Sequence, residues 1–337
     1  MSWKDRKDLG TKFIGDVYDA LRIDEHWCMD FERGYRWWAS DYAQTIIADP
    51  GVFHNLSSIY RVHAEIDILR GRGKAADCEM YLSTAMSRAN LNALTYDAEK
   101  DVYRLNCTVY VTEDNQEWLL KLFLGAVGLQ LAVAEQRAPL LAEALDAVVA
   151  TSGHVKHGMR DRAHPMVHAI EQFFVPMGAN ASKWIGVNEW NDASDVIRRL
   201  ALVCRTDSHT SLHAEFAWGE DPGPAAEGKT PVKLSVETDF RHAFLGNGLS
   251  LTLRLPLDMG DANEAHSALE LNALERKDWK WWHDFGSWCC LGNDLAFTCF
   301  VPNTLYHPQT LPQLVHAMAL RAQWVNELFM AGNPLLR

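Results

Sequence analysis

The stretch LSLTLRLP at residues 249–256 decides the fold class of the second half of the chain. Leucine occupies every second position, and Ser250, Thr252 and Arg254 fill the positions between. This period of two places the leucines on one face of a β-strand and the polar side chains on the other. Pro256 ends the strand, since proline cannot donate to a strand ladder. We therefore predict a strand with one buried face, which belongs to a sheet packed against helices.

The segments around this strand predict the rest of an antiparallel sheet and its helices. Residues 232–240 alternate in the same way, and residues 258–263 offer caps for a helix that reaches about Lys277. Residues 286–301 then predict a hairpin. Apolar residues that step by three and four between positions 311 and 329 predict a long amphipathic final helix.

The first half of the chain shows the same order of elements. Residues 59–69 alternate as a strand, residues 83–92 predict a short helix, and residues 103–111 predict the second strand of a hairpin. An amphipathic helix follows at 120–134, and a leading helix is expected at 4–21. Both halves therefore predict the order helix–strands–helix–hairpin–helix.

A repeated tetrapeptide supports an internal duplication. Leu-Asn-Ala-Leu at residues 91–94 recurs at residues 271–274. Together with the matched order of elements, it predicts that residues 78–136 and 249–330 superimpose as one fold. Each Asn of the tetrapeptide is then expected at or just after a helix end, where Asn tolerates left-handed geometry.

The fold class predicted from these patterns is α+β, with two tandem domains that each pack an antiparallel sheet with helices. A chain of 337 residues suits two domains. The polar stretch 151–163, with two glycines, predicts the linker between them. We expect the first domain at residues 1–150 and the second at residues 163–337.

The second half also resembles a known family. In it, residues 271–272 close a helix, Gly-Ser-Trp at 286–288 opens a strand, Gly-Asn-Asp-Leu at 292–295 forms the turn, and Phe-Val-Pro at 300–302 ends the strand. This order resembles the YbjN-like domain, which has the type III secretion chaperone-like fold. The first half resembles it less closely, because residues 97–101 replace the Gly-Ser-Trp strand entry.

The resemblance implies a bacterial α/β module, often paired, that is not an enzyme. Such a module binds another protein or modulates signalling or stress responses. Protein–protein contact, chaperone-like or regulatory, is therefore the function that the resemblance implies for this chain.

Composition excludes several classes of partner. Lys and Arg number 32 against 44 Asp and Glu, a formal charge of −12, which argues against nucleic acid as a partner. The seven scattered cysteines indicate reduced thiols in a cytoplasmic protein. The first ten residues are charged and lack the apolar region of a signal peptide. The most apolar window, 119–134, is shorter than the roughly 20 residues that span a membrane, so we predict no membrane partner.

Four histidines are weak candidates for a metal site. His154, His157, His164 and His168 lie close in sequence, and the last two have the i, i+4 spacing of zinc hydrolases. A metal-dependent hydrolase is therefore one alternative function. However, Pro165 stands where the general-base Glu of that motif would be, and it suits a first helical turn. We accordingly expect no metal and no cofactor.

Other catalytic motifs are absent from the sequence, so no catalytic residue is predicted. There is no nucleophile elbow and no phosphate-binding loop. Glu65 and Asp67 share one strand face and could act in acid–base chemistry, although a solvated polar face is the simpler interpretation. A small ligand in a cleft between the two domains is a further alternative.

The final helix predicts a surface for a partner. Leu320, Trp324 and Leu328 lie off its main apolar stripe and widen its apolar surface. Trp324 is the expected anchor of an inter-domain or homodimer contact, with Trp279 and Trp282 nearby. The partner is an unknown protein, for which a second copy of this chain is one candidate. Core packing of the same residues is the competing interpretation.

Overall fold

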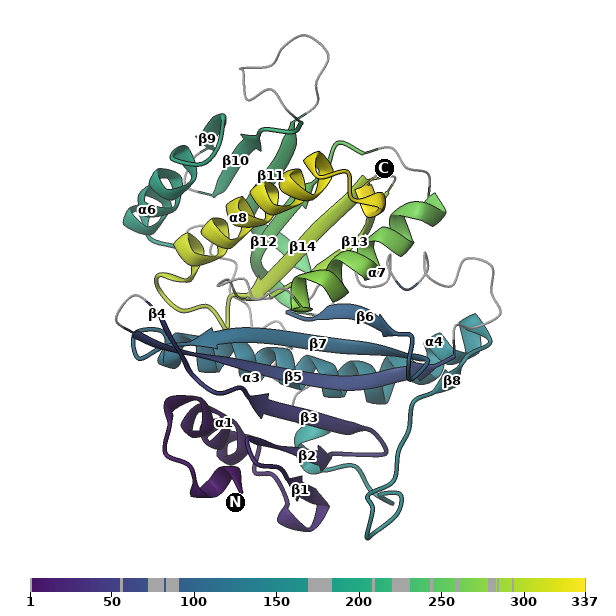
Figure 1. Ribbon diagram of the computed structural model, residues 1–337. Helices are drawn as coiled ribbons and strands as arrows, with labels where there is room; N and C mark the ends of the chain where they lie inside the picture. Colours follow the sequence, from purple (N-terminus) through teal and green to yellow (C-terminus); the bar gives the residue numbers. More distant parts are fainter. Residues whose placement is uncertain are drawn as a thin grey trace. The chain divides into compact units, whose positions relative to one another are not determined.

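The computed structural model describes residues 2–336 except 55–56, 72–81, 83–90, 169–183, 208–209, 220–230, 243–244, 258–260, 278–282, 284 and 293. The chain forms two compact units, each built on its own antiparallel sheet (Figure 1). The first unit comprises Met1–Cys78, Leu91–Phe173 and Glu275–Phe285, and the second comprises Glu79–Asn90, Phe174–Leu274 and Gly286–Arg337. The predicted α+β class with two sheet-and-helix units is confirmed.

Residues 151–163, which the sequence predicted to link the two domains, lie inside the first unit. Residues 151–163 belong to the first unit, because their backbone is bonded to the end of its sheet. Ser152 N donates to Asp41 O at 2.8 Å, and His164 N donates to Ala39 O at 2.6 Å. This polar stretch therefore packs on the sheet of the first unit.

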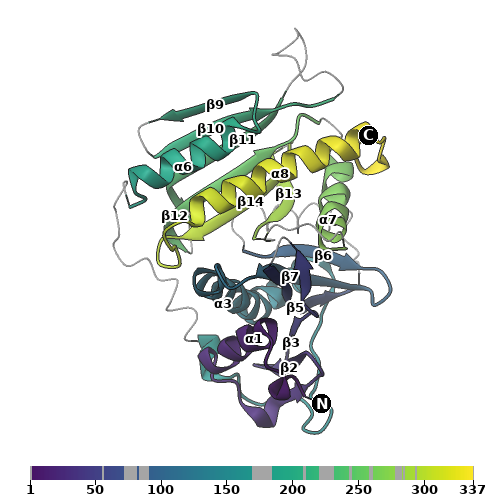
Figure 2. The same cartoon turned by 60° about the vertical axis from the view of Figure 1, so that its left-hand side comes forward.

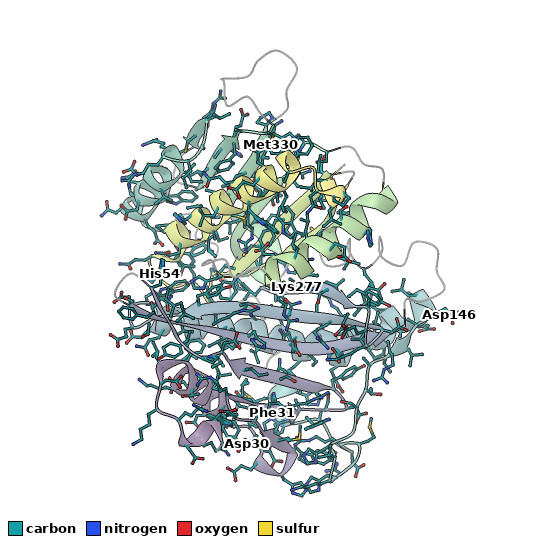
Figure 3. The ribbon with its side chains drawn as sticks, viewed as in Figure 1. Asp30, Phe31, His54, Asp146, Lys277 and Met330 are labelled. Carbon is teal, nitrogen blue, oxygen red and sulfur yellow. The ribbon has the colours of Figure 1, made fainter. Side chains whose placement is uncertain are left out.

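The first unit contains a sheet with strand order β1-β2-β3-β5-β7-β6, and β4 and β8 pair with β5 at its margins. Its strands are β1 Cys28–Asp30, β2 Gly34–Trp38, β3 Ala43–Ala48, β4 Val52–His54, β5 Ser57–Arg70, β6 Ala93–Asp97, β7 Val102–Val111 and β8 Val148–Val149. Figure 3 labels Asp30 at the end of β1 and His54 at the end of β4.

Helices α1 and α3 cover one face of this sheet, as Figure 2 shows. The face consists of alternate apolar side chains, and among those that the strand pattern predicted, Ala64, Ile66 and Leu105 are fully buried. The helical segments of the unit are η1 Trp3–Asp5, α1 Leu9–Ala20, η2 Glu25–Trp27, α3 Gln116–Ala132, the π-helical turn Val133–Arg137 and α4 Ala138–Leu145.

The continuous helix from α3 to α4 is a core helix. Gln116–Leu145 is the one helix among the described residues that is long and apolar enough to cross a membrane, and 72% of its apolar window is buried inside the protein. It is longer than residues 119–134, because the chain stays helical through the π-helical turn and Pro139 falls in the first turn of α4.

The second unit contains a sheet with strand order β13-β14-β12-β11-β10-β9. Leu249, Leu251 and Leu253 of β12 are fully buried, as the opening stretch of alternating leucines predicted. Helices α6 and α8 pack together and against this sheet. The elements are α6 Val187–Arg198, β9 Val203–Asp207, β10 Ser211–Phe216, β11 Val232–His242, β12 Gly246–Arg254, α7 Asp261–Lys277, β13 Ser287–Leu291, β14 Asp294–Pro302, α8 Thr310–Met330 and η4 Pro334–Leu336.

The two units have the same topology. In each, four strands follow one another across the sheet in chain order, and the second strand of a later hairpin pairs with the fourth. In each, the leading helix contacts the final helix: α1 with α3, and α6 with α8. The strand order and the contact of the leading helix with the final helix are therefore repeated, whereas the short helix predicted at 83–92 falls almost wholly outside the described residues.

The repeated tetrapeptide is not part of this correspondence, so the prediction that it takes the same place in both halves is wrong. The helix end predicted at Asn92 is not tested, because residues 83–90 lie outside the described residues. Residues 91–94 lead into β6, whereas residues 271–274 lie inside α7. Asn272 does not end its helix, because its buried amide bonds to the main chain of Trp288 and α7 continues to Lys277. Asn92 donates instead to Ala126 O in α3 at 3.0 Å.

Candidate functional site

A tight turn after β8 presents the candidate site. His154 and Gly158 form an isolated β-bridge, in which His154 N donates to Gly158 O at 2.7 Å and Gly158 N donates to His154 O at 2.9 Å. Gly158 has φ +73°, a left-handed conformation that suits glycine. Figure 1 shows this teal segment beside β1 and β2, within the first unit. We call residues 154–160 the turn.

Three imidazole rings stack at this turn. The rings of His26 and His157 have centroids 3.6 Å apart at 30°, and those of His157 and His154 have centroids 4.7 Å apart at 12°. Trp27 lies beside them, with its ring centroid 5.7 Å from His157 and 6.0 Å from His154. We call His26, His157 and His154 the imidazole stack.

His154 anchors the stack to the body of the unit. Its side chain is buried, and the Trp38 ring meets it edge-on at 4.7 Å. Its Nδ1 accepts a hydrogen bond from Lys156 N at 3.2 Å. The inner ring of the stack is therefore held by the sheet and by its own turn.

Arg160 anchors the far side of the turn. Its Nη1 donates to Trp38 O at 2.6 Å, and its guanidinium lies 5.1 Å from the centroid of the Trp27 ring. It also pairs with Asp24 at 3.5 Å. Bonds at both ends therefore fix the turn before any partner arrives.

The surroundings favour the neutral forms of His154 and His157. Burial lowers the pKa of His154, and the nearby His157, Lys156 and His26 lower it further by repulsion. The pKa of His157 is also lowered, first by desolvation and then by His26 and Lys156. Proton uptake by the stack is therefore opposed by cationic neighbours.

The outer side of the turn is exposed and partly apolar. Val155 is 74% exposed and Met159 is 48% exposed. Lys156, His157 and Arg162 are exposed beside them. Single exposed apolar residues are common on protein surfaces, but here two stand on one anchored turn among cations. The arrangement suits contact with another molecule.

The structure brings together only two of the four histidines predicted as weak metal candidates. His154 and His157 stack, His164 is buried with its ring 5.6 Å from that of Trp37, and His168 is exposed. Stacked imidazoles direct their nitrogens outward in near-parallel planes, so they do not converge on one ion. Within the described parts of the chain, no group of three His, Cys, Asp or Glu side chains could hold a metal.

His26 is the member of the site that the sequence did not indicate. It lies in η2, far from the turn in the chain, and no motif spacing connects the two segments. The sequence offers an excess of tryptophan as a signal, and Trp27 and Trp38 do line the site. Tertiary contact alone places His26 against His157.

The residue predicted to anchor a partner on the final helix is buried within the second unit. Trp324 is 3% exposed, and α8 makes its main contacts with α6, β10 and β12, all in the second unit. Because α8 lies against both the sheet and α6, its second apolar side is covered within the chain, and Trp324 has no exposed ring to offer a partner. Leu320 and Leu328 are partly exposed, while Trp279 and Trp282 lie outside the described residues.

The carboxylates of β5 are ion-paired, which corrects the prediction of a simply solvated face. Arg104 Nε lies 2.6 Å from Asp67 Oδ1, and its Nη1 lies 3.6 Å from Glu65. Arg276 pairs with the same Glu65. Burial by itself raises the pKa of Glu65, but the two guanidinium groups outweigh it and lower that pKa. These ion pairs connect β5, β7 and Arg276 within the first unit.

His63 lies beside these ion pairs. Its Nδ1 is buried and has no hydrogen-bond partner among the described residues. Burial and then Arg276 lower its pKa to about 4, so the ring is neutral at pH 7. We interpret this strand face as a structural support, since every charge in it has an opposite partner.

Comparison with family models, with curated proteins and with solved structures gives no significant match to this chain. The function is therefore argued from the geometry of the turn and its imidazole stack.

Proposed function

We propose that this chain is a non-enzymatic protein-binding module of two tandem YbjN-like domains, and that the turn is its binding surface. One observation carries the proposal. Val155 and Met159 are exposed on a turn whose ends are held by His154 and Arg160. The shared topology of the two units and the resemblance of the sequence support the family and the chaperone-like or regulatory role.

The anchoring of the turn favours binding. Ordering a loop on association costs about 0.5–1.5 kcal/mol for each immobilised side chain. Here the β-bridge, the Lys156 N bond to His154 and the Arg160 bond to Trp38 order the segment in advance. The apolar contacts of Val155 and Met159 are then available to a partner with little ordering cost.

The charge of the turn indicates an acidic partner segment. Lys156 and Arg162 are exposed here beside the single exposed Asp161, while Arg160 is already paired with Asp24, in a chain whose net charge is −12. Complementary charge gives specificity and a fast encounter. We therefore propose that the occupant is a segment of another protein with carboxylates beside apolar residues.

A comparison of three baits tests the proposal. The full chain, its Val155→Asp/Met159→Asp variant and a matched Val187→Asp variant are used to capture proteins from the native host. Val187 is 51% exposed on α6 in the second unit, so it controls for an added charge at an exposed valine. We expect a partner held by the wild type and by Val187→Asp to be lost by the double variant.

The folding of each bait is checked by circular dichroism and thermal unfolding. All three substituted side chains are exposed, so the melting curves should coincide. If the same proteins bind all three baits equally, the binding surface lies elsewhere and the proposal is wrong.

A further inference from the structure

The carboxylates nearest the imidazole stack are already engaged. Asp24 pairs with Arg160 at 3.5 Å, Glu25 pairs with Lys4 at 2.9 Å, and Asp30, labelled in Figure 3, lies 3.6 Å from the same lysine. Asp24 therefore has Arg160 as its cation, whereas Glu25 and Asp30 share Lys4. None of them is a main influence on His154 or His157.

The other titratable neighbours supply no negative charge. Burial raises the pKa of Cys28 to about 12, so its thiol stays protonated. Burial and then Arg160 lower the pKa of His164, so this ring stays neutral. Lys156 adds a positive charge beside the stack. The groups that most influence His154 and His157 are thus Lys156 and the neighbouring imidazoles, and none of these is an anion.

On the basis of the function proposed above, we infer that the imidazole stack couples binding of an acidic segment to the uptake of a proton. His26 and His157 form the exposed side of the stack, next to Val155 and Lys156. A partner carboxylate at these rings supplies an opposite charge in direct contact with them. A carboxylate within about 4–6 Å favours the imidazolium form.

Thermodynamic linkage then sets the direction of the effect. If the partner raises the affinity of the stack for a proton, the proton raises the affinity of the stack for the partner by the same factor. For every pKa unit by which binding raises the pKa of the stack, the protonated protein binds the partner about tenfold more tightly than the neutral protein. The surface accordingly binds more tightly as the pH falls through the range in which histidine titrates.

Two measurements on the full chain test this inference. The first is the affinity of a short fluorescein-labelled peptide alternating glutamate and leucine, measured by anisotropy from about pH 8 to about pH 5.5. The second is the NMR titration of the ring protons of His26 and His157 with and without that peptide. We expect about tenfold tighter binding at the acidic end and an upward pKa shift on the peptide-bound rings.

Substitutions separate this inference from the proposed function. His26→Gln and His157→Gln should retain the binding measured at pH 8 and lose its pH dependence. His213→Gln is the matched control, because His213 is an exposed histidine bonded to Ser235 in the second unit. A peptide alternating lysine and leucine should not bind.

The outcomes are distinct. Binding that is equal at all pH values, or whose pH dependence survives both glutamine variants, overturns the inference and leaves the proposed surface intact. Failure of the acidic peptide to bind at any pH also overturns it. The bait comparison tests only the proposed function, so its result does not depend on this pH experiment. Opening of the turn on protonation, seen as faster amide exchange at His154, would give weaker binding at low pH and would contradict it.

Discussion

Two glycines of the first unit differ in how much room they leave for the methyl group of an alanine. A Cβ on Gly34 in β2 would overlap the Ile46 carbonyl oxygen of β3 and lie 2.8 Å from the Cα of Ile47. A Cβ on Gly15 in α1 would meet nothing closer than the Trp3 ring at 3.4 Å. Gly34 is therefore required by a close approach of two strands, whereas Gly15 has room for a methyl group.

We predict opposite effects for alanine at these positions. Gly34→Ala should lower the free energy of unfolding by about 1–3 kcal/mol, because the strands must separate. Gly15→Ala should raise it by about 0.5–1 kcal/mol, since glycine inside a helix costs conformational entropy. Urea unfolding of both variants measures the two signs, and equal stability of Gly34→Ala and wild type would contradict the β2–β3 contact.

At the scale of elements, the start of α8 is joined to α6 by a hydrogen-bonded triangle. Leu311 N lies 3.2 Å from both Glu189 Oε1 and Tyr306 Oη, and Tyr306 Oη donates to Glu189. A carboxylate at a helix N-terminus satisfies free N–H groups and interacts favourably with the helix dipole. Burial and the bond to Glu189 raise the pKa of Tyr306, which stays protonated.

Removal of the Tyr306 hydroxyl should therefore destabilise the contact between α6 and α8. We predict that Tyr306→Phe lowers the free energy of unfolding by about 1.5–3 kcal/mol, because its partner is a charged group. Tyr18→Phe is the control, since the buried Tyr18 hydroxyl has no hydrogen-bond partner among the described residues and its loss should cost nothing. Chemical unfolding compares the two, and equal values would argue against the triangle.

The ion pairs of β5 and β7 predict an acid-sensitive first unit. The pKa of Glu65 in the folded protein is below its ordinary value of 4.5, so the unfolded chain binds the proton more tightly. The stabilisation by Glu65 is thus complete above about pH 4.5 and is lost as the pH falls through the lower, folded pKa.

Glu65→Gln should reveal this contribution. We predict a loss of about 1.5–3 kcal/mol in unfolding free energy near pH 6, and convergence with the wild type in strong acid. Glu237→Gln, at an exposed strand position of β11, should change little at either pH. A stability gap that does not close at low pH would show that the charge of Glu65 is not the cause.

At the scale of the whole molecule, each unit has its own sheet and its own core, although the last three residues of α7 belong to the first unit and the rest of that helix to the second. Ile66 on β5 and Leu251 on β12 occupy these two cores and are fully buried. Replacement of either by alanine should cost about 2–5 kcal/mol, because it leaves a cavity.

We predict that each cavity loosens mainly its own unit. Hydrogen exchange read by mass spectrometry should show faster exchange in β3, β5 and β7 of Ile66→Ala, and in β11, β12 and β14 of Leu251→Ala, because protection follows local stability. Uniformly faster exchange across both sheets in either variant would show instead that the chain unfolds as one cooperative unit.

The sequence by itself determined the elements and their repeated order. The alternation in β5, β11 and β12 and the helical stripe of α8 are local periods, and each reports which face of its own segment is buried. The tetrapeptide shows where such local signals stop, since Leu-Asn-Ala-Leu begins a strand at 91–94 and continues a helix at 271–274. Four residues do not outweigh the packing around them.

Only the tertiary structure decided the partners of those faces. It placed His26 against His157, Arg104 and Arg276 against Glu65, and α6 against α8. Each pairing joins residues far apart in the chain. The order of strands in a sheet and the packing of helices on it determine such contacts, and a local period records that a face is buried but not what covers it.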